Sequence, residues 1–406
     1  MNVIFIEPSF PYNQREFVRA LAATGAHVIG IGERPAAQLS DDVKGWLGDY
    51  VQVRSVVHEP SLLEAVRRVQ KAMWVDRLEA TVEAHIMAAA AVREATGIPG
   101  TSVQTAWLCR DKPAMKDALR AAGIPCAQST RARTPMEARE FAARVGYPLI
   151  VKPPAGAGAS GTWRVRDDDA LERVIRESGL AGGTAVAVEE FIEGHEGFID
   201  TLTINGEVAH EFITHYYPNV LEAMRERWIS PQMVTTNRID AEGYAEVREL
   251  ARKVNKALDI GTSATHMEWF FGPKGLKFSE IGCRPPGVGQ WDVYNAANEF
   301  DLYYEWASAI VHGRPERQPS RRYACGMIAL RPERDGRITG YSGVDRIGRR
   351  YAENVVAAHL PDPGTPTQPI EAGYMANAWM RVRHPDYDRL REILNEIGET
   401  VRVHAG

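Results

Sequence analysis

The sequence predicts a multidomain protein that combines α/β and α+β architecture. Its 406 residues exceed what one ordinary hydrophobic core accommodates, so we expect two or three domains. The first hundred residues alternate strand-like and helix-like apolar runs with short connections, which indicates a parallel sheet with helices on both faces. The rest of the chain mixes hairpins with helices, as α+β domains do.

The N-terminal alternation starts with a buried strand, NVIFIE, and a helix that continues to Gly25, a suitable C-cap. The further strands are HVIGIGE and RLEATVE, and the further helices are SLLEAVRRVQKAM and HIMAAAAVREATG. The glycines of IGIGER lack the third glycine of a dinucleotide fingerprint, and they follow the second strand instead of the first. We therefore give a dinucleotide site there little weight.

After residue 100 the chain first forms a helical linker, TAWLCRDKPAMKDALRAAGI. Strand-like segments then alternate with helices, and the dipeptide Asn205-Gly206 predicts a hairpin over residues 197–217. A long amphipathic helix is expected over residues 245–260. Two strands and a final helix over residues 323–398 indicate a small C-terminal α+β lobe.

The composition limits what the protein binds. With a net charge of -5 and a pI of about 6.2, the chain offers no electrostatic basis for nucleic acid as its main ligand. Its four cysteines show no CxxC or metal-binding spacing and are expected to be free thiols in a reducing compartment. Because no leader peptide and no run of about 18 apolar residues is evident, we expect a cytoplasmic protein without a membrane span.

A glycine-rich loop follows an apolar strand at VKPPAGAGASG, residues 151–161. Lys152 ends the strand, and Gly156, Gly158 and Ser160 lie in the loop. Glycines let backbone N–H groups approach an anion closely, and a lysine supplies the charge that phosphates need. The segment is not a Walker A loop, since GK[ST] is absent and a strand follows. Phosphate binding and a flexible hairpin loop are equally good interpretations.

Two other polar segments flank this loop. Lys112 stands at the start of a linker helix, a position where most lysines are simply solvated. Farther along, an apolar strand ends at Glu189, and Glu196 follows it. A strand that leaves a sheet exposes backbone groups that can bind an adenine edge, and a carboxylate can accept two hydrogen bonds from ribose hydroxyls. An acidic turn is the alternative interpretation.

The segment MEWFFGPKGLKFSEIGCRPPG, residues 267–287, carries two acids in a predicted hairpin. With a turn centred on Lys274, Glu268 and Glu280 lie directly opposite each other, with Cβ atoms about 4.5–5.5 Å apart. Such carboxylates repel unless cations lie between them, as Mg²⁺ does when it also contacts nucleotide phosphates. For the two glutamates to lie opposite each other on the same face of the hairpin, the turn must be a three- or five-residue loop, or one strand must contain a bulge. Arg284 comes next and is suited to clamp a transferring phosphoryl group.

The order of these features resembles the ATP-grasp superfamily, and within it the carboxylate–amine ligases. The resemblance extends from Met1 to about His312, and the C-terminal lobe is similar to that of L-amino acid ligases and, more distantly, biotin carboxylase. It implies a Rossmann-like pre-ATP-grasp α/β domain (1–100), a helical linker (101–125), an ATP-grasp lid subdomain (126–192), a central metal and phosphate subdomain (193–315) and a C-terminal α+β lobe (316–406).

The resemblance implies ATP as the nucleotide. The two lysines would contact its phosphates beneath the glycine loop, Glu189 would lie near the adenine amino group, and Glu196 would bind the ribose. The backbone at Phe191 and Ile192 would bind the adenine ring. The implied nucleotide residues are Lys112, Lys152, Gly156, Gly158, Ser160, Glu189, Phe191, Ile192 and Glu196.

The resemblance also implies a metal site and a catalytic arginine. Glu268 and Glu280 would hold one or two Mg²⁺ ions, with Mn²⁺ as the alternative ion. Arg284 would stabilise the acyl phosphate and the tetrahedral intermediate. One departure stands out: the family usually has Glu-Ile-Asn around the second glutamate, whereas this chain has Gly282 in place of the asparagine. The second metal site is therefore in doubt.

The residues that contact the substrates are harder to predict. Glu83 and His85 follow a strand at the carboxyl edge of the first sheet, where α/β folds tend to bind ligands. Two later segments, HYYPNVLEAMRERWISPQ and GVGQWDVYNAAN, could line a substrate site. A surface loop, a helix cap or a solvated side chain explains each residue at least as well. The substrate candidates are Glu83, His85, Arg225, Arg227, Gln290 and Trp291.

The activity that the resemblance implies is ATP-dependent ligation. ATP would phosphorylate a small-molecule carboxylate, and an amine would attack the acyl phosphate, with release of ADP and phosphate. Amino acid, dipeptide or natural-product synthesis would be the setting, and a homodimer through the first domain is compatible with the resemblance. Two alternatives stay open. One is a carboxylase-type enzyme that activates bicarbonate, although the chain has no Met-Lys-Met biotin-acceptor motif, and the other is a non-catalytic nucleotide-binding subunit, suggested by Gly282.

Overall fold

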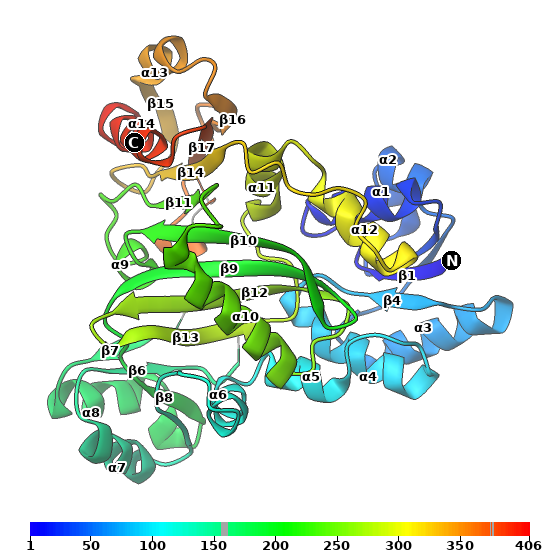
Figure 1. Cartoon of the computed structure of the whole chain (residues 1–406), viewed down its shortest axis with the longest axis horizontal. Helices are drawn as coiled ribbons and strands as arrows, with labels where there is room; N and C mark the ends of the chain where they lie inside the picture. Colours follow the sequence, from blue (N-terminus) through cyan, green and yellow to red (C-terminus); the bar gives the residue numbers. More distant parts are fainter. Residues whose placement is uncertain (156–160, 374, 376) are drawn as a thin grey trace.

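The computed structural model describes residues 1–155, 161–373, 375 and 377–406 (Figure 1). The first domain contains the parallel sheet that the strand–helix alternation predicts, with strand order β3-β2-β1-β4. Its strands are β1 (Asn2–Ile6), β2 (His27–Gly32), β3 (Asp49–Gln52) and β4 (Arg77–Glu79). Its helices are α1 (Gln14–Ala23), α2 (Asp41–Trp46), α3 (Glu59–Ala72) and α4 (Ile86–Thr96). The sequence did not predict β3, because this half-exposed edge strand has no apolar run.

Helices cover both faces of this first sheet. Successive side chains of a strand point to opposite faces. Accordingly, Val3 and Phe5 of β1 pack in one hydrophobic cluster with Phe17 of α1, whereas Ile4 and Ile6 pack in another with residues of α3 and α4. This burial on both sides accounts for the continuous apolar run of β1.

A helical linker leads from the first domain to a small antiparallel sheet, the lid sheet, with strand order β5-β8-β6-β7. The linker helices are α5 (Val103–Leu108) and α6 (Lys112–Ala121). The lid strands are β5 (Ser129–Ala132), β6 (Leu149–Lys152), β7 (Trp163–Val165) and β8 (Val186–Glu190), and the lid helices are α7 (Pro135–Val145) and α8 (Asp168–Glu177). Apolar residues of both helices bury one face of the sheet, which leaves the other face for a ligand.

An eight-stranded antiparallel sheet forms the centre of the molecule, in the order β13-β12-β9-β10-β11-β14-β17-β16. The predicted hairpin is present, and Asn205 and Gly206 between β9 and β10 both have positive φ, as a tight hairpin turn requires. The strands up to residue 282 are β9 (His195–Ile204), β10 (Glu207–Tyr217), β11 (Gln232–Thr235), β12 (Ser263–Gly272) and β13 (Gly275–Gly282). The accompanying helices are α9 (Val220–Ala223), α10 (Ala245–Ala257), α11 (Gln290–Asn298) and α12 (Leu302–His312).

The C-terminal segment continues the central sheet through β14 (Ala324–Leu330), β17 (Ala378–His384) and β16 (Val355–His359) (Figure 1). Only β15 (Ile338–Ser342) and β18 (Arg402–Ala405) form a separate pair, beside α13 (Val344–Arg350) and α14 (Tyr387–Thr400). The short 3-10 helices of the chain are η1 (Ala36–Gln38), η2 (Glu83–His85), η3 (Leu180–Gly182), η4 (Glu242–Tyr244) and η5 (Ile370–Ala372). The domain boundaries given above stay predictions.

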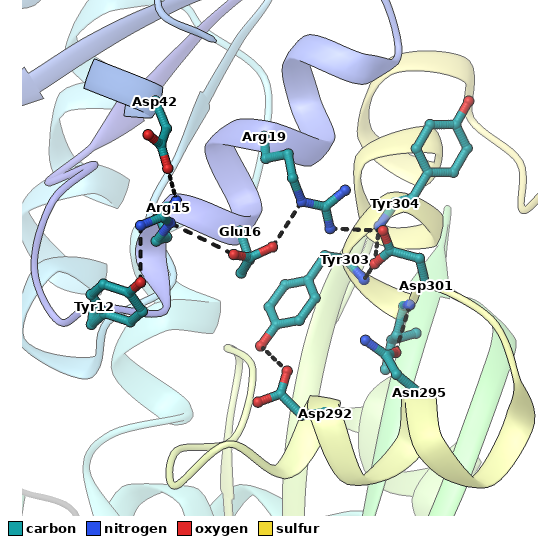
Figure 2. A network of polar contacts seen from close by, with 11 residues as sticks. Tyr12, Arg15, Glu16, Arg19, Asp42, Asp292, Asn295, Asp301, Tyr303 and Tyr304 are labelled. Carbon is teal, nitrogen blue, oxygen red and sulfur yellow. Dashed lines mark hydrogen bonds and ion pairs between the residues drawn. The ribbon is translucent and has the colours of Figure 1, made fainter. Parts of the chain in front are cut away.

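The first domain is joined to α12 by aromatic packing and by surface ion pairs. The ring of Phe17 lies 4.9 Å from that of Tyr303 and 5.1 Å from that of Trp306, centroid to centroid. Around this core, Figure 2 shows Arg19 of α1 between Glu16 and Asp301, and Arg19 donates to both carboxylates at 2.7 Å. The joint fixes the first sheet against the central one.

Arg19→Ala should lower the free energy of unfolding by less than about 1 kcal/mol, since exposed ion pairs contribute little. The Arg19 and Asp301 side chains are 33% and 38% exposed. Phe17→Ala should cost about 3 kcal/mol, because it removes a ring from a packed core, and Phe17 is only 1% exposed. Urea unfolding of both variants tests this, and equal losses would contradict it.

Candidate active site

A cavity of about 430 Å³ lies between the lid sheet and the central sheet. In the lid sheet, Ile150 of β6 pairs with Arg164 of β7 and with Glu189 of β8. These three neighbouring residues all line the cavity. From the central sheet come Glu196, Glu268 and Glu280 among others. The lining therefore combines an apolar wall with many charged groups, as expected of a nucleotide site.

A row of alternating charges starts at Lys116, which is buried outside the cavity lining, and continues along the cavity through Glu189, Lys152, Glu280 and Lys112. Nζ of Lys116 lies 2.6 Å from Oε2 of Glu189, and Nζ of Lys152 lies 3.0 Å from the same oxygen. Lys152 also lies 3.6 Å from Oε2 of Glu280, which in turn is 3.4 Å from Nζ of Lys112. The structure thus brings together four residues predicted to bind phosphates, adenine and metal, and it adds Lys116, which the sequence reasoning missed.

This row shifts the pKa values of its members. Burial acts to raise the pKa of Glu189, but Lys116 and Lys152 lower it to about 2. For Lys152 the carboxylates of Glu189 and Glu280 outweigh burial and raise the pKa. For Lys116, which is fully buried, burial outweighs the attraction of Glu189 and lowers the pKa to about 8. Lys152 therefore keeps its charge at neutral pH, whereas Lys116 loses its proton within about one pH unit above neutrality.

The predicted pairing of Glu268 with Glu280 is present in the register of β12 and β13. Gly272 pairs with Gly275, so the turn has two residues, and a bulge between Glu268 and Trp269 restores the phase. The sequence allowed either a three- or five-residue loop or a bulge, and the structure has the bulge. It places both carboxylates in the cavity.

Glu196 adds a third carboxylate to this end of the cavity. Its Oε2 accepts a hydrogen bond of 2.7 Å from the backbone N–H of Val220, at the start of α9. Burial, and then the negative charge of Glu268, raise the pKa of Glu196 to about 8. Three carboxyl groups thus gather at this end of the cavity, and those of Glu268 and Glu280 fit a hard divalent cation that takes its remaining ligands from phosphates and water. Within the described residues, no group of three His, Cys, Asp or Glu side chains is arranged to hold a metal by itself.

The two residues whose backbone is predicted to bind the adenine ring line the cavity beside the lid sheet. Phe191 and Ile192 both contribute to its wall, and the guanidinium of Arg164 lies 4.0 Å above the Phe191 ring. The backbone N–H of Phe191, however, donates to the carbonyl oxygen of Pro148 at 3.2 Å. The backbone N–H of Phe191 is therefore already engaged. The predicted backbone contacts with an adenine edge are then left to the Phe191 carbonyl oxygen and to Ile192.

Arg284 lies in a small recess beside the cavity, and both share Lys112 and Glu280 in their linings. Its Nε donates to Oε2 of Glu83 at 2.8 Å, and its Nη1 donates to the carbonyl oxygen of Pro285 at 2.8 Å. Glu83 belongs to the first domain, so two predicted site residues 201 positions apart in the chain meet here.

A buried network supports Glu268 from behind. Nδ1 of His266 lies 2.7 Å from Oδ1 of Asp200, and its Nε2 lies 3.8 Å from Oε1 of Glu268. Tyr294 donates its hydroxyl to the other oxygen of Asp200. The sequence reasoning missed this network, although Asp200 and His266 are ionisable residues within strands that also contain buried apolar residues, which is a usable signal.

The remaining substrate candidates have mixed outcomes. Arg225 lines the cavity, but Arg227 turns away and forms an ion pair of 2.8 Å with Asp335. Trp291 is 4% exposed and packs 5.1 Å from the ring of Phe17, so it belongs to the aromatic core.

Gln290 and His85 are also buried instead of lining either hollow. Gln290 donates to the hydroxyls of Thr214 and Thr235 at 3.1 and 3.0 Å. Burial lowers the pKa of His85. The predicted loop residues Gly156, Gly158 and Ser160 lie outside the described part of the chain.

Comparison with known proteins agrees with this geometry. Residues 117–300 match the ATP-grasp domain, and the chain therefore contains an ATP-grasp domain. The predicted fold class is confirmed by a solved L-amino acid ligase from Bacillus licheniformis, which superposes with a TM-score of 0.77 over 100% of this chain and 98% of that one at 18% identity. At this identity the likeness concerns the fold. No helix among the described residues has the length and apolar character of a membrane span.

The curated relatives that match in sequence include two ligases of Bacillus subtilis. An L-arginine-specific L-amino acid ligase of Bacillus subtilis is 28% identical over 248 residues, which make up 59% of this chain and 59% of the relative. An alanine–anticapsin ligase of Bacillus subtilis (strain 168) is 26% identical over 287 residues, or 63% of this chain and 60% of the relative. The chain thus spans about 59–60% of the length of these relatives.

Proposed function

We propose that the protein is an ATP-dependent ligase that phosphorylates a small-molecule carboxylate and joins it to an amine, with release of ADP and phosphate. The observation that carries this proposal is the row of charges from Lys116 to Lys112, in which Glu280 is also the cross-strand partner of Glu268 in the cavity lining. The predicted roles of the individual site residues are part of the proposal.

Lys112 and Lys152 are placed to bind the phosphates of the nucleotide. Each lysine already contacts Glu280, so an incoming phosphate would join a network that holds both ammonium groups in position. On the lid side, Ile150 and Phe191 offer an apolar wall for a base, and Glu189 offers an acceptor for an amino group. These contacts favour an adenine nucleotide.

Glu268 and Glu280 are the residues that would hold Mg²⁺, or Mn²⁺ in its place, while the nearby Glu196 would bind the ribose. When bound, the ion would neutralise phosphate charge and ATP would supply the phosphoryl group. Arg284 adds a guanidinium where the phosphate site meets the recess, suited to a developing negative charge on the reacting carboxylate. The relatives named L-arginine-specific L-amino acid ligase and alanine–anticapsin ligase support a carboxylate and an amine as the substrates.

A phosphate-release screen over pairs of amino acids and carboxylic acids tests the proposal, with Glu280→Ala as the blank. ADP and phosphate should form only when both a carboxylate and an amine are present. AMP and pyrophosphate as products would contradict the proposal. Hydrolysis that depends on bicarbonate would favour a carboxylase-type enzyme, and tight Mg-ATP binding without any product would favour a non-catalytic subunit.

A further inference from the structure

Gly282 lies between two site residues, Glu280 and Arg284. Its φ is not among the positive values that favour glycine, so its backbone accommodates other residues. A Cβ atom at this position would lie 3.5 Å from Oε2 of Glu83 and 3.6 Å from Cγ of Arg284. One carbon therefore fits at ordinary contact distance, but a longer side chain would enter the space that the Glu83 carboxylate occupies.

Glu83 is held firmly in that space. Besides accepting from Nε of Arg284, it lies 3.7 Å from Nε of Arg110, and Nη1 of Arg110 donates to its backbone oxygen at 2.7 Å. The Glu83 and Arg284 side chains are only 20% and 14% exposed, so water screens their interaction weakly. The carboxylate reaches the site from η2, at the carboxyl edge of the first sheet.

These contacts fix the orientation of the guanidinium. Glu83 engages Nε of Arg284, and the carbonyl oxygen of Pro285 engages Nη1. Among the contacts between described residues, none involves Nη2 of Arg284, which leaves its two N–H donors for a ligand in the recess. A planar guanidinium bound on two of its nitrogens cannot rotate freely, so the direction of the third is set.

We propose that Glu83 is the positioning residue of Arg284, and that Gly282 provides the space through which Glu83 reaches it. The proposal rests on the proposed function, in which Arg284 contacts the reacting groups. In this view Gly282 is not simply a lost metal ligand. The first domain contributes to the reaction site, and an asparagine at position 282 would displace the carboxylate that orients Arg284.

Gly282→Asn, with Gly282→Ala as the matched control, separates the two explanations. If Gly282 provides space, Gly282→Asn should lower kcat about 100-fold, since a small displacement of a catalytic group has an effect of this size. Gly282→Ala should lose far less. The number of Mn²⁺ ions bound in the presence of ADP, counted by electron paramagnetic resonance, should not rise in either variant. An additional Mn²⁺ ion in Gly282→Asn without a loss of kcat would overturn the proposal.

A double-mutant cycle with Glu83→Ala tests the shared space directly. Each single variant should lose about 100-fold in kcat, but Gly282→Asn should cost less than about threefold when Glu83 is already alanine, because interacting sites are not additive. Glu83→Gln keeps an acceptor for Nε and should recover part of the activity. Losses that multiply in the double variant would overturn the proposal.

The same four proteins give a second cycle, in unfolding temperature, which needs no turnover. If the two positions share the space, the second substitution should add little to the shift that the first one causes. Independent shifts would overturn the proposal even if activity is never observed. A wild-type protein that forms no ADP with any acid–amine pair would refute the proposed function, and the unfolding cycle would still decide whether Glu83 and Gly282 are coupled.

Discussion

Lys152→Met should lower kcat/KM about 1000-fold, the upper range for removal of one preorganised donor to a developing charge. It should also destabilise the protein by about 3 kcal/mol, because removal of one partner leaves buried charge uncompensated. Lys152 is the ammonium group shared by Glu189 and Glu280, at 3.0 and 3.6 Å, and its side chain is 12% exposed. Without it, two carboxylates face the phosphate site with less positive charge between them.

Two control variants separate the parts of this effect. Lys274→Met removes a lysine that pairs with Glu190 at the surface, where its side chain is 74% exposed, so it should change stability by less than about 0.5 kcal/mol. Lys152→Arg keeps the charge and should recover stability more fully than activity, because its donors are placed differently. Steady-state kinetics and urea unfolding give both quantities. A Lys152→Met protein within tenfold of wild-type activity would contradict a phosphate contact.

The hairpin that carries Glu268 and Glu280 was largely predictable from the sequence. Two acids in otherwise apolar strands twelve residues apart, followed by an arginine, indicated opposed carboxylates, and the register pairs Glu268 with Glu280. The sequence did not show whether a bulge or a longer loop brings the two glutamates opposite each other, because both give the same alternation of side chains. That choice depends on how β12 and β13 pack.

Lys116 shows how a readable signal was missed. It stands four residues after Lys112 and beside Met115 and Leu119, so it lies on the stripe that α6 buries. A lysine on the apolar stripe of a helix needs a buried partner, which makes it a candidate site residue. Because most lysines are solvated, the position of Lys116 on the buried stripe of α6 was overlooked.

Contacts between domains were beyond the sequence. The meeting of Glu83 with Arg284 joins residues 201 positions apart, and no local pattern specifies it. The same holds for Trp291, which was a predicted substrate contact because its segment follows Arg284. Its burial depends on Phe17, which is supplied by the first domain.

Lys116→Met should raise the KM for ATP about tenfold at neutral pH, because one buried positive charge behind the proposed nucleotide site is lost. Lys116 holds Glu189 together with Lys152. Without Lys116, Glu189 would interact more strongly with Lys152, the lysine that we propose to bind phosphate. Stability should change little or even rise, because for Lys116, unlike for Lys152, the cost of burying the charge outweighs the attraction of Glu189. Lys253→Met, at a lysine 63% exposed on α10, is the matched control.

The pH dependence makes this prediction specific to the Lys116 proton. Burial lowers the pKa of Lys116 from 10.5 to about 8, so between these values the unfolded chain binds the proton more tightly than the folded protein does. Raising the pH through this interval therefore favours the folded state, and this contribution should be missing in Lys116→Met. The wild type should also bind ATP more weakly as Lys116 loses its charge, and its KM should approach that of the variant by about pH 10. A tenfold difference in KM that persists there would show that the shape of the lysine side chain, and not its charge, accounts for the effect.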